Sequence, residues 1–380
     1  MLRAFAIAAA AVIITAPAGF ALEDHQIADA RFLPATSAGK LLVSRAHCAN
    51  PVSQTFVGTT TWHFCFDAVS RFGLIIRQAA FRKAPTAPLV EILGDMRVAE
   101  IFVPYHSGSP RFFDISGHSF PLLGLSAADC PAPHKIIGGG KVCKEVRDRG
   151  LAWKKDGLVR RGKELVLWSV LDADNYNYVI EWSFRDDGSI SGKAGSTGPK
   201  LGGANDTRGH MHYFSWRIDI DLNGPDGDSV SVETHREDLT VTPSTGNDIS
   251  RPVAMESGHT WEARSFTVLK VVDSTLRNAR NRQTAYHLQP LRTGTARHTE
   301  AHTAKDFWVT RYSNSELFAK NVGAYVDGDA TTNSDIVLWY NGAAHHEQDM
   351  RDEDRDTVPI LWTGFELVPS NMFERTPFFP

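Results

Sequence analysis

The stretch Tyr-Phe-Ser-Trp-Arg-Ile-Asp-Ile-Asp-Leu, residues 213–222, decides the fold class. Its second part alternates apolar with charged side chains: Trp216, Ile218 and Ile220 against Arg217, Asp219 and Asp221. Successive side chains of a β-strand point to opposite faces of the sheet. The stretch therefore predicts a strand with one apolar and one charged face.

Similar short runs recur along the chain. They cover residues 60–66, 73–81, 97–103, 165–171, 178–184, 228–235, 266–272, 307–312 and 335–340. Turn formers such as Asp-Gly at 187–188 and Asn-Gly at 223–224 separate them. Many short strands with this punctuation predict an all-β fold, a large antiparallel β-sandwich. One helix is expected around residues 86–96, where an apolar stripe follows a proline.

The N-terminus predicts export. Arg3, an apolar run and a small-residue ending at Ala21 form a secretory signal pattern over residues 1–21. Residues 22–58 are expected to form an N-terminal extension and 59–380 a single β domain. We expect no membrane span, since no later stretch approaches ~20 apolar residues. The predicted location is secreted or periplasmic.

The composition argues against a nucleic-acid partner and indicates how the cysteines are paired. A formal charge of -4 leaves no basic surface for nucleic acid. The four cysteines of an exported chain suit two disulfides, for which three pairings are possible. We expect the nearest-neighbour pairing, Cys48 with Cys65 and Cys130 with Cys143.

Two histidines at strand spacing suggest a metal site. His210 and His212 are two residues apart, so in a strand both side chains project from the same face. Imidazole suits copper or zinc. A third ligand is needed, and His345-His346, which follows another apolar run, offers one.

Several motifs, taken in order, resemble the catalytic domain of the copper amine oxidases. That family makes a quinone cofactor from one of its own tyrosines, within an Asn-Tyr element. The corresponding segments here are EIFVPY (100–105), NYNY (175–178), HMHYFSWRIDIDL (210–222), WVTRY (308–312) and GFELVPSNMF (364–373). The resemblance covers roughly residues 60–380 and implies a short, divergent member with the family's sandwich.

The resemblance assigns roles to particular residues. Tyr176, preceded by Asn175, is expected to become topaquinone. His210, His212 and His346 are the expected copper(II) ligands, with His346 favoured over His345. Tyr105 is expected to hydrogen-bond the quinone and hold its ring, while Tyr178 is expected only to pack.

The catalytic base departs from the family pattern. The family places its aspartate about fourteen residues after the tyrosine that corresponds to Tyr105, and here that position is Ser119. Asp114, nine residues after Tyr105, reaches the same place if the loop is five residues shorter. Asp114 is therefore the predicted base.

A second cation site is also implied. Asp219, Asp221 and Asp335 match a peripheral calcium-type site of the family, with backbone oxygens from Ile220 and Ile336. Hard cations prefer such oxygen ligands. The family's disulfide falls at Cys130 and Cys143, which supports that pairing.

The expected activity is oxidation of a primary amine by O2, giving aldehyde, ammonia and hydrogen peroxide. Family members are usually homodimers with interlocking arms, and residues 287–302 are the candidate arm. Two alternatives stay open. One is a copper-binding β-sandwich scaffold with impaired catalysis, favoured by Ser119; the other is a zinc hydrolase with unmodified Tyr176.

Overall fold

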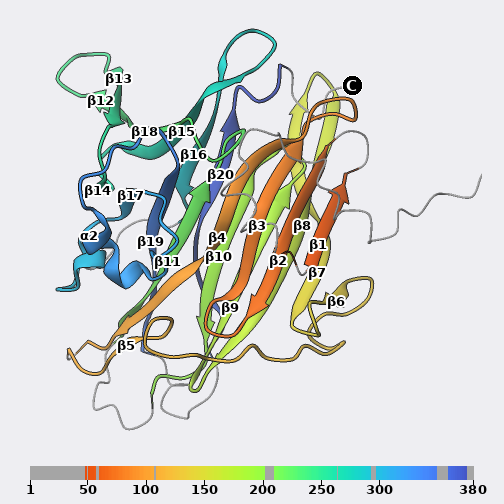
Figure 1. The fold of residues 1–380 in the computed structure, drawn as a ribbon, viewed down its shortest axis with the longest axis vertical. Coiled ribbons are helices and arrows are strands. Elements are labelled where there is room, and N and C mark those ends of the chain that lie inside the picture. The colour runs from red at the N-terminus through yellow and green to blue at the C-terminus, as the bar shows by residue number, and fades with distance from the viewer. Residues whose placement is uncertain are drawn as a thin grey trace, which may run out of the picture.

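The computed structural model is a two-sheet β-sandwich. It describes residues 48, 50–56, 60–106, 108–201, 209–262, 264–291, 297–348 and 358–374. The expected signal peptide and most of the expected extension lie outside these residues. The predicted all-β antiparallel fold is confirmed (Figure 1).

The first sheet contains nine strands in the order β1-β2-β3-β4-β11-β19-β17-β14, with β5 paired to β4. Their bounds are β1 Asn50–Thr55, β2 Thr61–Val69, β3 Gly73–Arg82, β4 Val90–Pro104, β5 Arg111–Phe113, β11 His210–Ile220, β14 Ser257–His259, β17 Phe307–Arg311 and β19 Ile336–His346. All pairings are antiparallel.

The second sheet contains eleven strands in the order β13-β12-β15-β16-β20-β10-β9-β8-β7-β6, with β18 paired to β12. Their bounds are β6 Lys135–Ile137, β7 Val142–Lys155, β8 Leu158–Ala173, β9 Tyr176–Arg185, β10 Ile190–Thr197, β12 Asp228–Asp238, β13 Thr245–Val253, β15 Phe266–Arg277, β16 Gln283–Pro290, β18 Thr332–Ser334 and β20 Leu361–Ser370. The described helical turns are short: Ala301–Ala304, Ala319–Asn321 and α2, Val322–Tyr325.

Large aromatic side chains fill the space between the sheets. Phe64 of β2 stacks on Phe184 of β9 with ring centroids 4.1 Å apart, and Trp216 of β11 meets Phe365 of β20 edge-on at 5.5 Å. Trp182 donates its indole N–H across the core to the carbonyl of Leu74 at 2.8 Å. Burial of such side chains is the main force that holds two sheets together.

Strand β11 alternates as its sequence predicts. Trp216 and Ile218 lie fully buried in the core. The charged face is nevertheless buried too, since Arg217 is only 2% exposed and lies against the ring of Tyr312. Both faces of β11 can therefore carry a shielded site.

The helix expected around residues 86–96 is wrong. These residues enter β4, a central strand between β3 and β11 that is buried on both faces. A strand covered on both sides needs apolar residues without strict alternation, and a short run of that kind is easily mistaken for a helical stripe.

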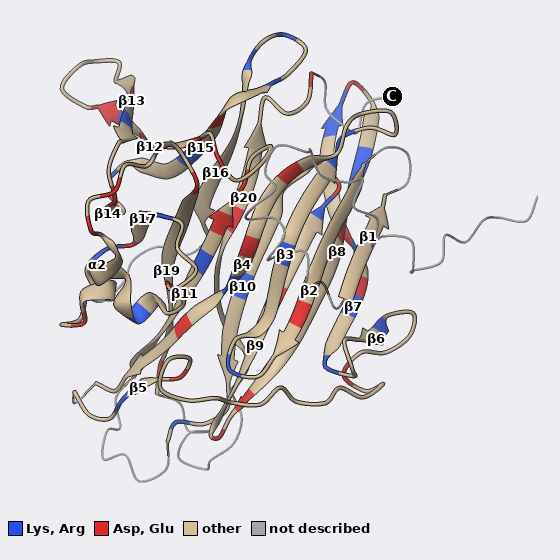
Figure 2. Ribbon diagram, in the orientation of Figure 1, with Lys and Arg blue, Asp and Glu red and all other residues tan. Residues whose placement is uncertain are grey.

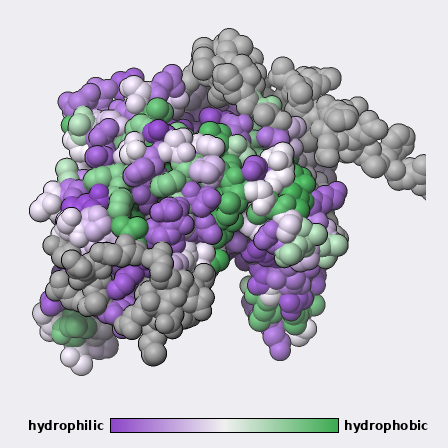
Figure 3. All heavy atoms as spheres, turned by 90° about the horizontal axis from the view of Figure 1, so that it is seen from below, coloured by the Kyte–Doolittle hydropathy of each residue, from purple (hydrophilic) through white to green (hydrophobic). Residues whose placement is uncertain are grey.

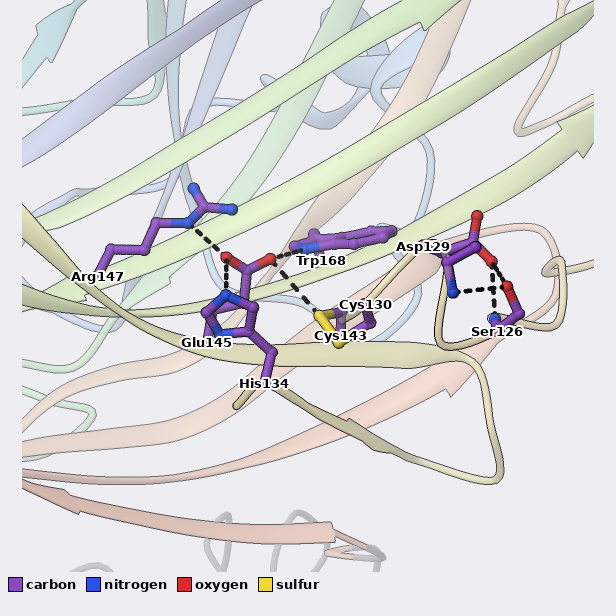
Figure 4. Close-up of a disulfide and its surroundings, with 9 residues drawn as sticks. Ser126, Asp129, Cys130, His134, Cys143, Glu145, Arg147 and Trp168 are labelled. Carbon is purple, nitrogen blue, oxygen red and sulfur yellow. Dashed lines mark hydrogen bonds and ion pairs between the residues drawn. A yellow bond between two sulfur atoms is a disulfide. The ribbon is translucent and has the colours of Figure 1, made fainter. Parts of the chain in front are cut away.

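Both predicted disulfides are present, Cys48–Cys65 and Cys130–Cys143. The second lies beside Glu145, which accepts hydrogen bonds from Trp168 and Arg147 and faces His134 at 3.8 Å (Figure 4). In the part of the chain that the structure describes, no helix is long and apolar enough to cross a membrane.

Residues with charges of both signs are spread over the strands of both sheets (Figure 2), and apolar and hydrophilic residues alternate on the surface seen from below (Figure 3). A long hairpin, β12–β13, projects from the second sheet, and Leu239 near its tip is 82% exposed. The expected arm at 287–302 differs: its start belongs to β16, His302 is buried, and residues 292–296 are outside the described chain.

Candidate metal and tyrosine site

Three histidines meet on the core side of the first sheet. His210 and His212 lie in β11, and His346 ends the neighbouring β19, where the register pairs His210 with His346. Each offers a ring nitrogen, and these nitrogens lie within 4.8 Å of one another. We call these three residues the histidine cluster. His345 is exposed, so it is His346, and not His345, that lies with His210 and His212.

The protonation of the histidine cluster suits a metal. Burial lowers the pKa of His212 well below its ordinary value, and the neighbouring His210 and His346 lower it further. A neutral imidazole keeps a lone pair for coordination. Three buried imidazoles form a donor set that fits copper(II).

Tyr176 reaches the histidine cluster from the opposite sheet. A two-residue turn, in which Asp174 adopts φ 65°, joins β8 to β9 and makes Tyr176 the first residue of β9. Its phenol oxygen lies 3.1 Å from Nε2 of His210 and 3.0 Å from Nδ1 of His346. Tyr176 is 4% exposed, so this contact is made inside the core.

Tyr105 and Asn175 hold the neighbourhood of Tyr176 in place. The Tyr105 ring stacks on His210 with centroids 4.2 Å apart, and its hydroxyl accepts the backbone N–H of Leu201 at 2.8 Å. Burial raises the pKa of Tyr105, while hydrogen bonds that include Tyr176 and Asn175 lower it. Asn175 donates to the carbonyl of Pro199 at 2.8 Å.

Asp114 lies at the end of β5 and faces the same region. It is 6% exposed, and Tyr178 donates a hydrogen bond to its Oδ2 at 2.5 Å. Burial raises the pKa of Asp114 to about 6, although the Tyr178 hydrogen bond and the nearby His118 act in the opposite direction. Ser119, which stands fourteen residues after Tyr105 where the family has its aspartate, is exposed.

Two residues of this site were missed from the sequence. Tyr178, expected only to pack, also fixes the Asp114 carboxylate. Glu100 is fully buried, and its Oε1 accepts the backbone N–H groups of Ile101, Ile115 and Ser116 at 3.1, 3.0 and 3.3 Å. A carboxylate that accepts three backbone donors fixes the turn that carries Asp114. The same-face spacing of Tyr176 and Tyr178 was the available signal for Tyr178.

A second group of ligand atoms lies at the other end of the same two strands. Asp219 lies near the end of β11, Asp221 follows that strand, and Asp335 precedes β19; their carboxylate oxygens lie within 4.8 Å of one another. We call these three residues the aspartate cluster. A Cβ added at Gly94 would overlap Asp221 and Asp219, so glycine leaves room for their oxygens. Buried carboxylates with room between them fit a hard cation such as calcium.

Comparison with known proteins places the chain in a family. A sequence profile described as "Copper amine oxidase, enzyme domain" matches residues 146–379. The chain belongs to the copper amine oxidase family. Its curated relatives include "Primary amine oxidase 2" of Arabidopsis thaliana, 27% identical over 83% of this chain and 57% of that protein. The "Primary amine oxidase" of Pisum sativum is 25% identical over 84% of this chain and 59% of that protein.

The chain thus spans less than two thirds of the length of these relatives. Solved structures share the fold. A copper-containing benzylamine oxidase from Hansenula Polymorpha superposes with a TM-score of 0.70 at 18% identity, covering 86% of this chain and 62% of that one. An Aspergillus nidulans amine oxidase gives a TM-score of 0.69 at 17% identity, covering 84% and 52%.

Proposed function

We propose that this protein is a primary-amine oxidase that converts an amine and O2 to aldehyde, ammonia and hydrogen peroxide. One observation carries the proposal: the phenol oxygen of Tyr176 contacts ring nitrogens of two of the three clustered histidines. A quinone made from Tyr176 would therefore lie beside a metal ion held by these histidines.

His210, His212 and His346 would hold the copper(II), and Tyr176 would become the quinone. Together these groups supply an electron sink for the amine and a route for two electrons to O2. The remaining tasks belong to this chain's own side chains.

Asp114 acts as the base. Removal of a proton from the amine-bearing carbon needs a carboxylate that is ionised yet basic, and a pKa of about 6 meets both needs near neutral pH. Tyr178 holds one carboxylate oxygen, which leaves Oδ1 for the proton. Glu100 keeps the turn of Asp114 in position.

Tyr105 and Asn175 act as positioning residues. The stack of Tyr105 on His210 and its hydroxyl beside Tyr176 limit the orientations of the Tyr176 ring. Asn175 anchors the turn before that ring. Burial of the whole site excludes water and strengthens these interactions.

Three further assignments complete the proposal. The aspartate cluster binds calcium or a similar cation, with backbone oxygens of Ile220 and Ile336. The protein is a homodimer, and the projecting β12–β13 hairpin is the part of this fold best suited to reach a second copy. Two disulfides favour an oxidising compartment, either secreted or periplasmic.

The rival scaffold function predicts no turnover, so a peroxide assay separates the two. Copper-loaded protein is supplied with benzylamine, phenethylamine and a short aliphatic amine in air. We expect amine-dependent peroxide from wild type and from Ser119→Ala, and none from Tyr176→Phe. Peroxide that persists in Tyr176→Phe contradicts the proposed cofactor. If wild type releases no peroxide with any of the three amines, the result favours the copper-binding scaffold with impaired catalysis.

A further inference from the structure

The base of the proposed reaction is buried, yet one exposed side chain faces it. Asp114 Oδ1 lies 3.8 Å from Nδ1 of His118, which is four residues further along the same loop. The Asp114 side chain is 9% exposed and the His118 side chain 45% exposed. His118 therefore connects the carboxylate to solvent.

The loop holds His118 in this position. Its imidazole stacks on Phe120, with ring centroids 5.1 Å apart and planes 17° from parallel. The carbonyl of Phe120 accepts the backbone N–H of Arg71 at 2.7 Å, and the guanidinium of Arg71 reaches the carbonyl of Ser116 at 3.4 Å. The stack thus rests on a segment that the turn between β2 and β3 fixes at two points.

The two oxygens of Asp114 have different partners. Oδ2 accepts the hydrogen bond of Tyr178, a phenol whose pKa is raised well above its ordinary value by burial and by the Asp114 charge. Such a phenol keeps its proton and cannot carry one away. Among the described residues, other titratable side chains near this loop include Tyr105 and Glu100, both buried, and Arg71, whose guanidinium is not a proton acceptor. Lys320 and the buried His302 contact the ring of Phe113, the residue before Asp114. His118 alone of these combines exposure with a proton-accepting nitrogen.

We propose that His118 carries protons between Asp114 and solvent during turnover. The inference rests on the proposed oxidase function, because it assigns an exit to the proton that Asp114 takes from the amine. The O–H bond on Asp114 breaks, an N–H bond forms at Nδ1 of His118, and the imidazolium then gives one proton to water or a buffer base. No oxidation state changes. The 3.8 Å gap exceeds a direct hydrogen bond, so a ring rotation or one bridging water closes it.

A matched control exists in the same chain. His134 faces Glu145 at 3.8 Å, the same distance as His118 to Asp114, beside the Cys130–Cys143 disulfide (Figure 4). His134→Gln removes an equivalent histidine–carboxylate pair outside the proposed site. His118→Gln keeps a polar side chain of similar length.

The test compares these two variants with wild type. We expect His118→Gln to lower kcat at least about tenfold in dilute buffer, to leave KM within about twofold, and to recover as imidazole is added. With α-deuterated amine, its isotope effect on kcat should fall below that of wild type, because proton release now limits the rate. His134→Gln should match wild type throughout.

Two outcomes overturn the relay. An unchanged kcat in His118→Gln at all buffer concentrations shows that protons leave by another route. A slow variant with a larger isotope effect and no response to imidazole shows that His118 only positions Asp114. In copper-loaded wild type, phenylhydrazine gives a coloured adduct with a working quinone. Its absence refutes the oxidase function, and the relay with it, before any variant is compared.

A second readout needs no turnover. The Asp114 carboxyl can be titrated by 13C NMR in all three proteins. Since a charged His118 lowers the pKa of Asp114, its midpoint should rise in His118→Gln and stay unchanged in His134→Gln. An equal midpoint in all three means that the two groups are not coupled.

Discussion

Strands β11 and β19 carry two ligand clusters that differ in almost every physical respect. The histidine cluster lies at one end, on the core side, and offers ring nitrogens. The aspartate cluster lies at the other end, on the outer side, and offers carboxylate oxygens beside Arg217 and Tyr312. The proposed function would place a copper ion beside Tyr176 at one end of this pair of strands and a hard cation at the other end.

Strand alternation places the histidine cluster and the aspartate cluster on opposite faces of the first sheet. Even positions of β11 face the other sheet, where Tyr176 lies, whereas odd positions face away. We therefore expect changes in the histidine cluster to abolish activity and changes in the aspartate cluster to affect mainly stability. The following tests probe that division.

The largest effect is expected from His212→Ala. Loss of one of three ligands should weaken copper binding by more than the ~10–100-fold typical of losing a ligand's supporting partner. Quinone formation and amine oxidation should then fall below detection, as measured by metal content and peroxide release. His345→Ala, at an exposed neighbour of His346, is the control and should retain both.

Asp114→Asn should follow in size. Loss of a general base lowers kcat by about 10²–10⁴-fold. In wild type, kcat/KM should fall as pH drops through about 6, because protonation of Asp114 removes the base. A variant with the wild-type rate and pH profile would exclude Asp114 from this role.

Asp114→Asn should also raise the free energy of unfolding at pH 7. The pKa of folded Asp114 exceeds the ordinary value of 3.8, so the folded state binds more protons than the unfolded state between these values. Wild type should lose stability as pH rises from about 4 to 6, and Asp114→Asn should not. Denaturant unfolding at pH 4 and pH 7 measures the difference.

Tyr178→Phe should have a smaller effect on activity than Asp114→Asn and should raise the pKa of Asp114. The hydrogen bond from Tyr178 lowers the pKa of Asp114, and a bond to a charged acceptor is worth ~1.5–3 kcal/mol. The acidic limb of the kcat/KM profile should therefore move upward by about one to two pH units. An unmoved limb would mean that this contact does not tune the base.

The smallest effect on activity is expected at the aspartate cluster. Gly94→Ala places a methyl group against Asp219 and Asp221 and should prevent cation binding. At calcium concentrations ~100 times Kd, wild type should gain ~2.7 kcal/mol of stability over the variant. Thermal unfolding with and without calcium measures this gain, and peroxide release should change little. A large loss of activity would break the proposed division.

The sequence predicted the strands better than it predicted the cross-strand contacts. The alternation in residues 213–222 identified β11, and the spacing of His210 and His212 placed both on one face. The helix at 86–96 failed because β4 is buried on both sides and shows no alternation. Short-range patterns cannot reveal which faces a neighbouring segment covers.

For the candidate site, too, the sequence predicted individual residues but not their contacts. Asp114 was predicted from the family pattern, by assuming that the loop after Tyr105 is five residues shorter than usual. The contacts of Asp114 with Tyr178 and His118, and the role of Glu100 in its turn, depend on how the two sheets and a loop meet. The contacts with Tyr178 and Glu100 join separate segments, and the contact with His118 depends on the shape of the loop, so none of them follows from sequence spacing alone.

Tyr176, and not its neighbour Tyr178, is the residue proposed to become the cofactor. The most direct test of this assignment is fragmentation mass spectrometry of the peptide that contains both tyrosines, after metal-free protein has been exposed to copper and air. We predict that Tyr176 gains two oxygen atoms and loses two hydrogens, that Tyr178 stays unmodified, and that the change is absent in His212→Ala. An unmodified Tyr176 in copper-loaded wild type would rule out Tyr176 as the source of a quinone cofactor.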